Sequence, residues 1–130
     1  MNTRATDLTI LVAEDEDAVR RLVRRVLTRE GFTVLEAENG RVAVELADAH
    51  EGAIHLFLTD VVMPELSGPR AAERILERRP GTVVLYMSGY AEGEIAESGE
   101  LDPDVRFLEK PFDPQSLLAA VWDVLGGRGP

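Results

Sequence analysis

An α/β fold, in which helices cover both faces of one parallel β-sheet, is predicted by three features of the sequence. Short apolar runs alternate with longer segments whose apolar residues recur at helical spacing, a pattern typical of β-α-β units. The short runs are continuously apolar, as strands buried on both faces are. The 130 residues, 45% of them apolar, suit one domain with a single core. Because crossover connections are right-handed, few strand orders remain, and we predict 2-1-3-4-5.

The first half of the chain contains two predicted strands, "LTILVA" (residues 8–13) and "FTVLEA" (32–37). The helix between these strands ends at Gly31, a typical C-cap, and a second helix follows Asn39 and Gly40. Their buried faces carry apolar residues at helical spacing, namely Val19, Leu22, Val23, Val26 and Leu27, then Val42, Ala43, Leu46 and Ala47.

The second half contains three predicted strands, "IHLFLT" (54–59), "TVVLYM" (82–87) and "VRFLE" (105–109). A third helix follows residues 67–69, and the last helix begins with Asp113 as N-cap and Pro114 in the first position. Glycines and a proline in residues 91–104 leave room for only a short, frayed fourth helix in a mobile segment. We predict a single domain over 1–130, with a core over about 8–125 and flexible tails at 1–7 and 126–130.

The composition excludes several classes of protein. The formal net charge of −10 argues against binding to a phosphate backbone, and the absence of cysteine excludes disulfides and cysteine-ligated metals. No apolar run is long enough to span a bilayer, and no G-x-G-x-x-G follows the first strand, which disfavours a dehydrogenase. We therefore predict a cytoplasmic domain that binds neither nucleic acid nor membranes directly.

Polar residues stand at the carboxyl ends of four predicted strands, where open α/β sheets bind their ligands. Glu14 and Asp15 follow the first strand, Asp60 the third, Ser88 the fourth and Lys110 the fifth. Three carboxylates at neighbouring strand ends repel one another unless a cation lies between them. Mg²⁺ prefers oxygen ligands and commonly binds carboxylates together with a phosphate, so the pattern predicts a Mg²⁺-dependent phosphoryl site.

Asp60 is the candidate nucleophile, because a carboxylate can attack a phosphoryl donor to give an aspartyl phosphate. Lys110, the one lysine among 14 basic residues, and the Ser88 hydroxyl would surround the phosphoryl oxygens. Taken singly, these residues have simpler explanations: Asp60 could cap a turn before Pro64, and residues 14–17 could cap a helix. Their coincidence at one sheet edge favours the functional interpretation.

Four motifs resemble the receiver domains of two-component response regulators (CheY-like receivers), and the similarity covers essentially the whole chain. They are "ILVAEDED", "LTDVVMPELSG", "MSGY" and "FLEKPF", with 45 residues from Asp15 to Asp60, 28 more to Ser88 and 22 more to Lys110. The segment "GELDPDVRFLEKPF" is most similar to receivers attached to hybrid sensor histidine kinases. The strand order 2-1-3-4-5 predicted above is the flavodoxin-like version of the fold.

The resemblance also implies the role of each site residue. Asp60 would accept the phosphoryl group, and Glu14, Asp15, Asp60 and the backbone carbonyl of Val62 would hold Mg²⁺. Glu14 replaces the family's more frequent Asp, which leaves open whether it ligates directly or through water.

The same resemblance implies the parts of a conformational switch. Ser88, in place of the commoner Thr, would bond the phosphoryl oxygen, Lys110 would neutralise it, and Phe107 would follow Ser88 inward. The bond from Lys110 to Pro111 would be cis.

Val62 and Tyr90 flank the acceptor, and we hypothesise that their bulk restricts the hydrolytic water and lengthens the phosphorylated lifetime.

The implied function is a signalling receiver that catalyses only its own aspartyl phosphorylation and dephosphorylation. Its phosphoryl donor would be a histidine kinase or a histidine phosphotransfer protein, whereas the downstream partner is not identifiable. A phosphorylation-dependent homodimer is left open. The alternatives are a phospho-independent interaction module and a haloacid-dehalogenase-like phosphatase, which normally has a second Asp where Val62 stands.

An arginine-rich face is predicted on the first helix, formed by Arg20, Arg21, Arg24, Arg25 and Arg29. It is either a solvated face paired with glutamates or a docking surface for the phosphoryl donor. His50 and His55 fall away from the predicted site and are not expected to be catalytic.

Overall fold

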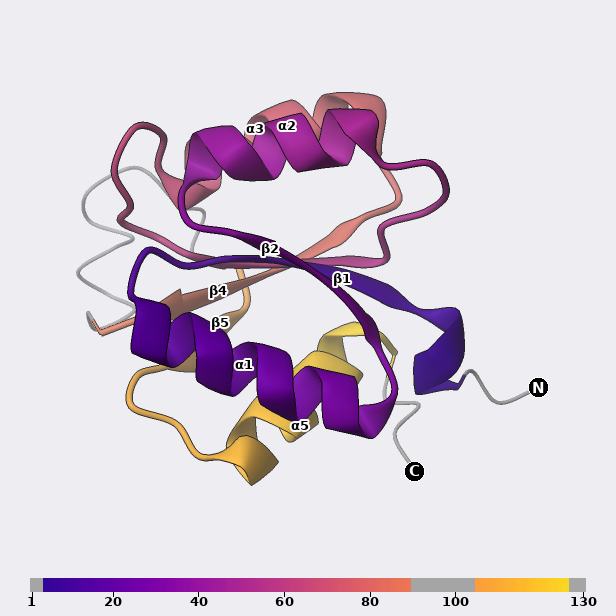
Figure 1. Cartoon of the computed structure of the whole chain (residues 1–130), viewed down its shortest axis with the longest axis vertical. Coiled ribbons are helices and arrows are strands. Elements are labelled where there is room, and N and C mark those ends of the chain that lie inside the picture. The colour runs from indigo at the N-terminus through magenta and orange to yellow at the C-terminus, as the bar shows by residue number, and fades with distance from the viewer. Residues whose placement is uncertain (1–3, 90–104, 127–130) are drawn as a thin grey trace.

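The computed structural model describes residues 4–89 and 105–126, which form an α/β sandwich (Figure 1). The strands are β1 (Thr9–Ala13), β2 (Thr33–Ala37), β3 (Leu56–Asp60), β4 (Val83–Ser88) and β5 (Phe107–Glu109). The helices are α1 (Asp17–Glu30), α2 (Gly40–Ala49), α3 (Gly68–Arg78) and α5 (Pro114–Val124), preceded by a short 3-10 helix, η1 (Ala5–Asp7). The five strands are parallel and lie in the order β2-β1-β3-β4-β5, which confirms the predicted flavodoxin-like topology.

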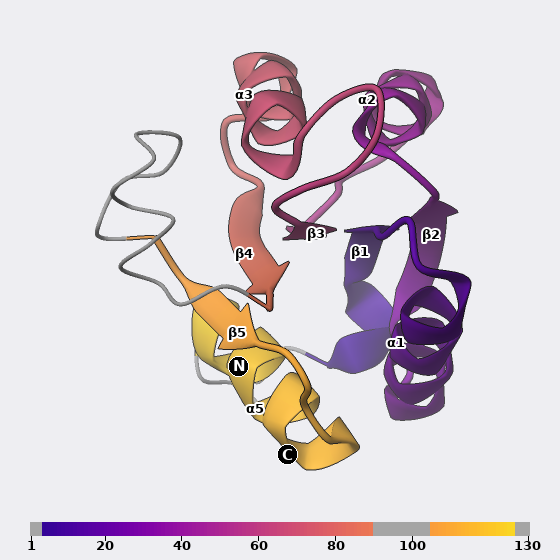
Figure 2. The ribbon, with the colours of Figure 1, turned by 90° about the vertical axis from the view of Figure 1, so that its left-hand side faces the viewer.

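The helices form two layers, with α1 and α5 on one face of the sheet and α2 and α3 on the other (Figures 1 and 2). Each layer encloses its own hydrophobic cluster, because side chains alternate between the faces of a strand. Val12, Leu58 and Met87 point into the α1–α5 layer, whereas their neighbours Leu11 and Phe57 point into the α2–α3 layer. The sheet is therefore buried on both faces, as its continuously apolar strands predict.

The helix ends follow the capping signals in the sequence. Gly31 closes α1 at φ +116, and its backbone N–H donates to the carbonyls of Leu27 and Thr28. Asp113 caps α5 by accepting from the backbone N–H of Ser116 at 2.7 Å, a bond that also holds the pKa of this carboxyl below its usual range. Both predicted caps are confirmed.

The structure differs from the predictions mainly at element boundaries. Every strand starts one or two residues later than its apolar run. Within residues 1–7, for which flexibility stays a prediction, residues 5–7 form η1 and the Ala5 side chain packs into the core. The short fourth helix and the mobility predicted for 91–104 lie outside the described residues. Within the described ranges, no helix has the length and apolarity to cross a membrane.

Candidate functional site

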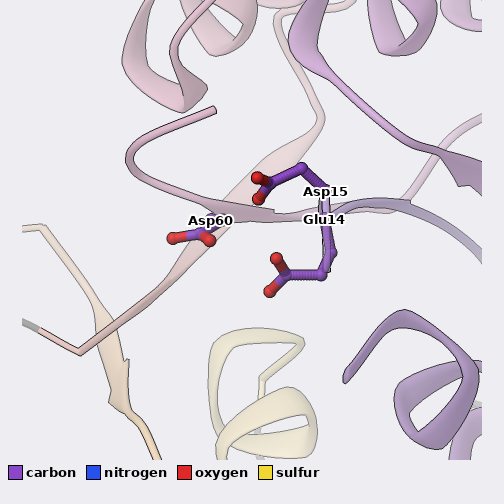
Figure 3. Close-up of side chains that lie close together, drawn as sticks. All are labelled: Glu14, Asp15 and Asp60. Atoms are coloured by element: carbon purple, nitrogen blue, oxygen red, sulfur yellow. The ribbon is translucent and has the colours of Figure 1, made fainter. Parts of the chain in front are cut away.

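Three carboxylates gather at the carboxyl edge of the sheet (Figure 3). Glu14 and Asp15 directly follow β1, and Asp60 is the last residue of β3, the neighbouring strand. One oxygen from each of the three lies within 4.8 Å of the others. Glu14 is fully buried, whereas Asp15 is exposed and Asp60 is partly buried. The arrangement leaves the cluster open on the side of Asp15.

Lys110 brings a positive charge into this cluster from the far end of the sequence. Its Nζ donates to Glu14 Oε1 at 2.6 Å and to Asp60 Oδ2 at 3.0 Å, and its side chain is 18% exposed. The backbone N–H of Lys110 donates to the Ser88 carbonyl at 2.8 Å, which continues the β4–β5 pairing. The peptide bond from Lys110 to Pro111 is cis, as predicted.

The electrostatics of the cluster are dominated by the burial of Glu14. Burial raises the pKa of this carboxyl to about 7, although the hydrogen bond from Lys110 acts in the opposite direction. Burial by itself lowers the pKa of Lys110, but its bonds to Glu14 and Asp60 outweigh this effect and raise it. One ammonium thus serves two of three carboxylates, and this donor set suits a small divalent cation that prefers oxygen ligands.

The predicted switch residues lie on β4 and β5. Ser88 is buried at the end of β4, which pairs with the strand that ends at Asp60, and Phe107 begins β5. The half-buried ring of Phe107 packs at 39° to that of Tyr86, with 5.9 Å between the ring centroids. Val62 is 57% exposed, and Tyr90 lies outside the described residues.

The segment after Asp60, residues 61–67, forms a loop that we call the acceptor loop. The backbone N–H of Val61 donates to the Met87 carbonyl at 3.3 Å, and the N–H of Gly68 donates to the Val61 carbonyl at 2.8 Å. A Cβ atom on Gly68 would lie 2.1 Å from the Asp60 carbonyl oxygen. Glycine is therefore required where α3 begins, because its backbone touches the end of β3.

Arg20 has a structural role that the sequence did not predict. It was assigned to the exposed face of α1, but its side chain is only 16% exposed. Its guanidinium donates to the backbone carbonyl of Glu14 at 2.8 Å and also bonds Asp17. Arg20 therefore fixes the turn between β1 and α1, whereas Arg21, Arg24, Arg25 and Arg29 are exposed as predicted. Helical periodicity alone could not reveal this contact, because it depends on the path of the turn.

Comparison with known proteins yields one consistent family. The family model described as "Response regulator receiver domain" matches residues 10–122. The chain is 38% identical over 126 residues to the sensor kinase CckA of Brucella abortus, and 32% identical over 116 residues to the response regulator receiver protein CpdR of the same organism. It is also similar to the crystal structure of the receiver domain from the hybrid histidine kinase CckA, with a TM-score of 0.69, 36% identity and coverage of 90% of this chain and 98% of that one.

These relatives differ in how much of their length the chain represents. The match with the sensor kinase covers 94% of this chain but 13% of the kinase. The match with CpdR covers 89% of this chain and 95% of CpdR. The similarity therefore includes a receiver that is a small part of a kinase and one that makes up nearly a whole protein.

Proposed function

The chain belongs to the response regulator receiver domain family, a family of two-component signalling modules, and on this premise we propose that Asp60 is its phosphoryl acceptor. The observation that carries the proposal is the bond from Lys110 Nζ to Asp60 Oδ2, 3.0 Å long, beside the carboxylates of Glu14 and Asp15. An ammonium in contact with the acceptor oxygen is the group that a transferred phosphoryl needs, because phosphoryl transfer depends mainly on positioning and on neutralisation of charge.

The proposed reaction needs few protein groups. A carboxylate oxygen of Asp60 forms a bond to phosphorus while the bond to the donor nitrogen breaks on the opposite side, and the donor leaves with the electron pair of that bond. Lys110 keeps its proton and offsets the charge of the phosphoryl oxygens. The Ser88 hydroxyl, at the end of the neighbouring strand β4, donates to one of these oxygens.

Mg²⁺ is the proposed cofactor, and the residues present fit it. Glu14, Asp15, Asp60 and the Val62 carbonyl would hold the ion, with the three carboxylates supplying oxygen atoms that lie within 4.8 Å of one another. When bound, Mg²⁺ supplies positive charge and orients the transferred group.

Phosphorylation of Asp60 also changes the conformation of the domain. Ser88 moves toward the new anion, and Phe107 then turns inward and changes the surface around β5 and α5.

The domain catalyses only its own phosphorylation and dephosphorylation. The shielding effect of Val62 and Tyr90 stays a prediction, which the dephosphorylation rate of Val62→Asn tests. The cytoplasmic location and the phosphorylation-dependent homodimer also stay predictions.

We also propose that the phosphoryl donor docks in the groove between α1 and α5. The groove is lined by apolar residues and by two arginines and one glutamate, namely Leu22, Val26, Pro114, Leu118, Arg25, Arg29 and Glu30. The exposed arginines form a basic face on a chain whose net charge is −10. An apolar groove with a basic edge fits an amphipathic helix with acidic flanks, such as a helix that carries the donor histidine.

Charge reversal tests this docking surface. We expect Arg25→Glu with Arg29→Glu to slow phosphotransfer at least about tenfold from the best donor in a panel of phosphorylated histidine phosphotransfer proteins and kinase fragments. The rate with phosphoramidate, which needs no docking surface, should not change. The matched control is Arg70→Glu with Arg74→Glu, which makes the same charge change at two exposed positions on α3. Equal slowing by both pairs, or slowing with phosphoramidate as well, would contradict the docking proposal.

Intact mass spectrometry tests the acceptor. Wild-type protein incubated with phosphoramidate and Mg²⁺ should gain one phosphoryl group, whereas Asp60→Asn protein should gain none. EDTA should abolish the wild-type adduct. A wild-type protein that stays folded but gains no phosphoryl group would favour a phospho-independent interaction module instead.

A further inference from the structure

We propose that Glu65 is a positioning residue of the acceptor site, whose carboxylate ties the acceptor loop to the start of α2 and thereby sets the path of the backbone at Val62. The inference rests on the proposed function, because it gives that loop a task in Mg²⁺ binding and phosphorylation. Three independent contacts of the loop carry it.

The first is the backbone of Glu65 itself. Its φ is +67, and among the residues that the structure describes it is the one non-glycine residue with positive φ. The N–H of Leu66 donates to the Pro64 carbonyl at 2.8 Å, which closes a three-residue turn centred on Glu65. Such a turn strains the backbone of a non-glycine residue, whereas glycine would adopt it without strain. The side chain therefore does something that glycine could not.

The second contact is made by the Glu65 carboxylate, which binds two donors at the start of α2. Asn39 Nδ2 donates to Oε2 at 3.1 Å, and Arg41 Nε donates to Oε1 at 3.0 Å. Asn39 is itself held in place, because it is 5% exposed and its Oδ1 caps α2 by accepting from the Val42 N–H at 2.8 Å. The carboxylate is thus fixed to a rigid helix end.

The third contact is a close approach between backbones. A Cβ atom on Gly40 would lie 2.2 Å from the Leu66 carbonyl oxygen, so the loop rests directly on the first residue of α2. At the start of the loop, the Asp60 carbonyl touches Gly68 in the same way. Val62 lies between these two anchored points, and its carbonyl is the proposed backbone ligand for Mg²⁺.

A purely stabilising role does not account for Glu65. The side chains of Arg41 and Glu65 are 52% and 51% exposed, and exposed ion pairs contribute little to stability. The hydrogen bond from Asn39 adds to this gain, but the strain of the turn offsets most of it. Positioning accounts for the strained residue, because an error of about 1 Å in a reacting group can slow a reaction about a hundredfold.

Two single variants release the loop without damaging the helix. Glu65→Gly removes both bonds and relieves the strained backbone, and Asn39→Asp keeps an oxygen to cap α2 but replaces the donor to Glu65 with a repelling charge. We expect both variants to bind Mg²⁺ more weakly in calorimetric titrations and to react with phosphoramidate about three- to tenfold more slowly. The urea unfolding midpoint of Glu65→Gly in EDTA should be no lower than that of the wild type, because this variant also relieves the strained turn.

A double variant and a control make the test specific. Asn39→Asp combined with Glu65→Gln reverses donor and acceptor, so it should restore Mg²⁺ affinity and rate. Glu45→Ala removes the other partner of Arg41, 2.7 Å away, without touching the loop, and should behave as the wild type.

Three outcomes separate the inference from the function on which it rests. Wild-type rates and Mg²⁺ affinity in Glu65→Gly and Asn39→Asp would overturn the positioning role. Slower reaction that only parallels a loss of stability, without recovery in the double variant, would also overturn it in favour of a structural role. A wild type that gains no phosphoryl group at all would instead refute the proposed function, and this inference with it.

Discussion

At the scale of single residues, Glu14 is the one acidic or basic side chain that is buried in the described part of the chain. It is a carboxyl with no exposed surface, and its two oxygens accept from Lys110 Nζ at 2.6 Å and from the Glu16 backbone N–H at 3.1 Å. Buried carboxyls hold their proton more tightly than exposed ones because burial disfavours the charged form. The protonation state of Glu14 should therefore link pH to the stability of the metal-free protein.

We expect stability to fall with rising pH through this one group. The pKa of Glu14 is about 7 in the folded protein and 4.5 in its ordinary state, so the folded state binds the proton more tightly. The stabilising contribution is fully present below pH 4.5 and is lost as the pH rises through about 7. Urea unfolding in EDTA measures it, with Glu14→Gln as the variant that cannot ionise.

The comparison between wild type and Glu14→Gln isolates the group, because all other titrating residues are shared. The wild type should lose more free energy of unfolding than the variant between about pH 5 and pH 8. Parallel pH profiles for the two proteins would show that the pKa of Glu14 is not raised in the folded state.

At the scale of elements, the acceptor site depends on how closely α3 approaches β3. The start of α3 touches the carbonyl of Asp60 at Gly68, where an added Cβ would lie 2.1 Å from the oxygen. We expect Gly68→Ala to push the two elements apart, to lower the free energy of unfolding by about 1–3 kcal/mol and to slow phosphorylation. Urea unfolding and the rate of reaction with phosphoramidate measure the two effects.

Gly81→Ala is the matched control for this substitution. A Cβ on Gly81 would meet no heavy atom within 4 Å, so this variant should change stability by less than about 0.5 kcal/mol. Equal stability of Gly68→Ala and Gly81→Ala would show that α3 can move away from β3 at little cost.

At the scale of the whole molecule, the sequence predicts the sheet and the ends of its strands because hydrophobic periodicity determines which segments are buried. The topology brings Glu14, Asp15, Asp60 and Lys110 to one edge, although up to 96 residues separate two of them. The contacts of Arg20 and Glu65 were not predicted, because they depend on the exact path of irregular loops. Periodicity describes helices and strands but carries no information on a turn such as the one at Glu65.

A switch of the whole domain between two states requires a minimum difference in free energy. To change a population from 1:99 to 99:1, phosphorylation must favour the active state by about 5.5 kcal/mol. Hydrogen bonds to charged groups contribute about 1.5–3 kcal/mol each. The proposed contacts of the phosphoryl group with Lys110 and Ser88, together with Mg²⁺, are therefore sufficient in number to bias the domain.

The location of the phosphoryl group tests the central claim most directly. Protein treated with phosphoramidate and Mg²⁺ is reduced with borohydride, which converts an aspartyl phosphate to homoserine, and is then digested and sequenced by tandem mass spectrometry. Conversion at position 60 alone, absent when EDTA replaces Mg²⁺, is the expected result. Conversion at Asp15 or at any other carboxyl, or conversion at position 60 that persists in EDTA, would contradict it.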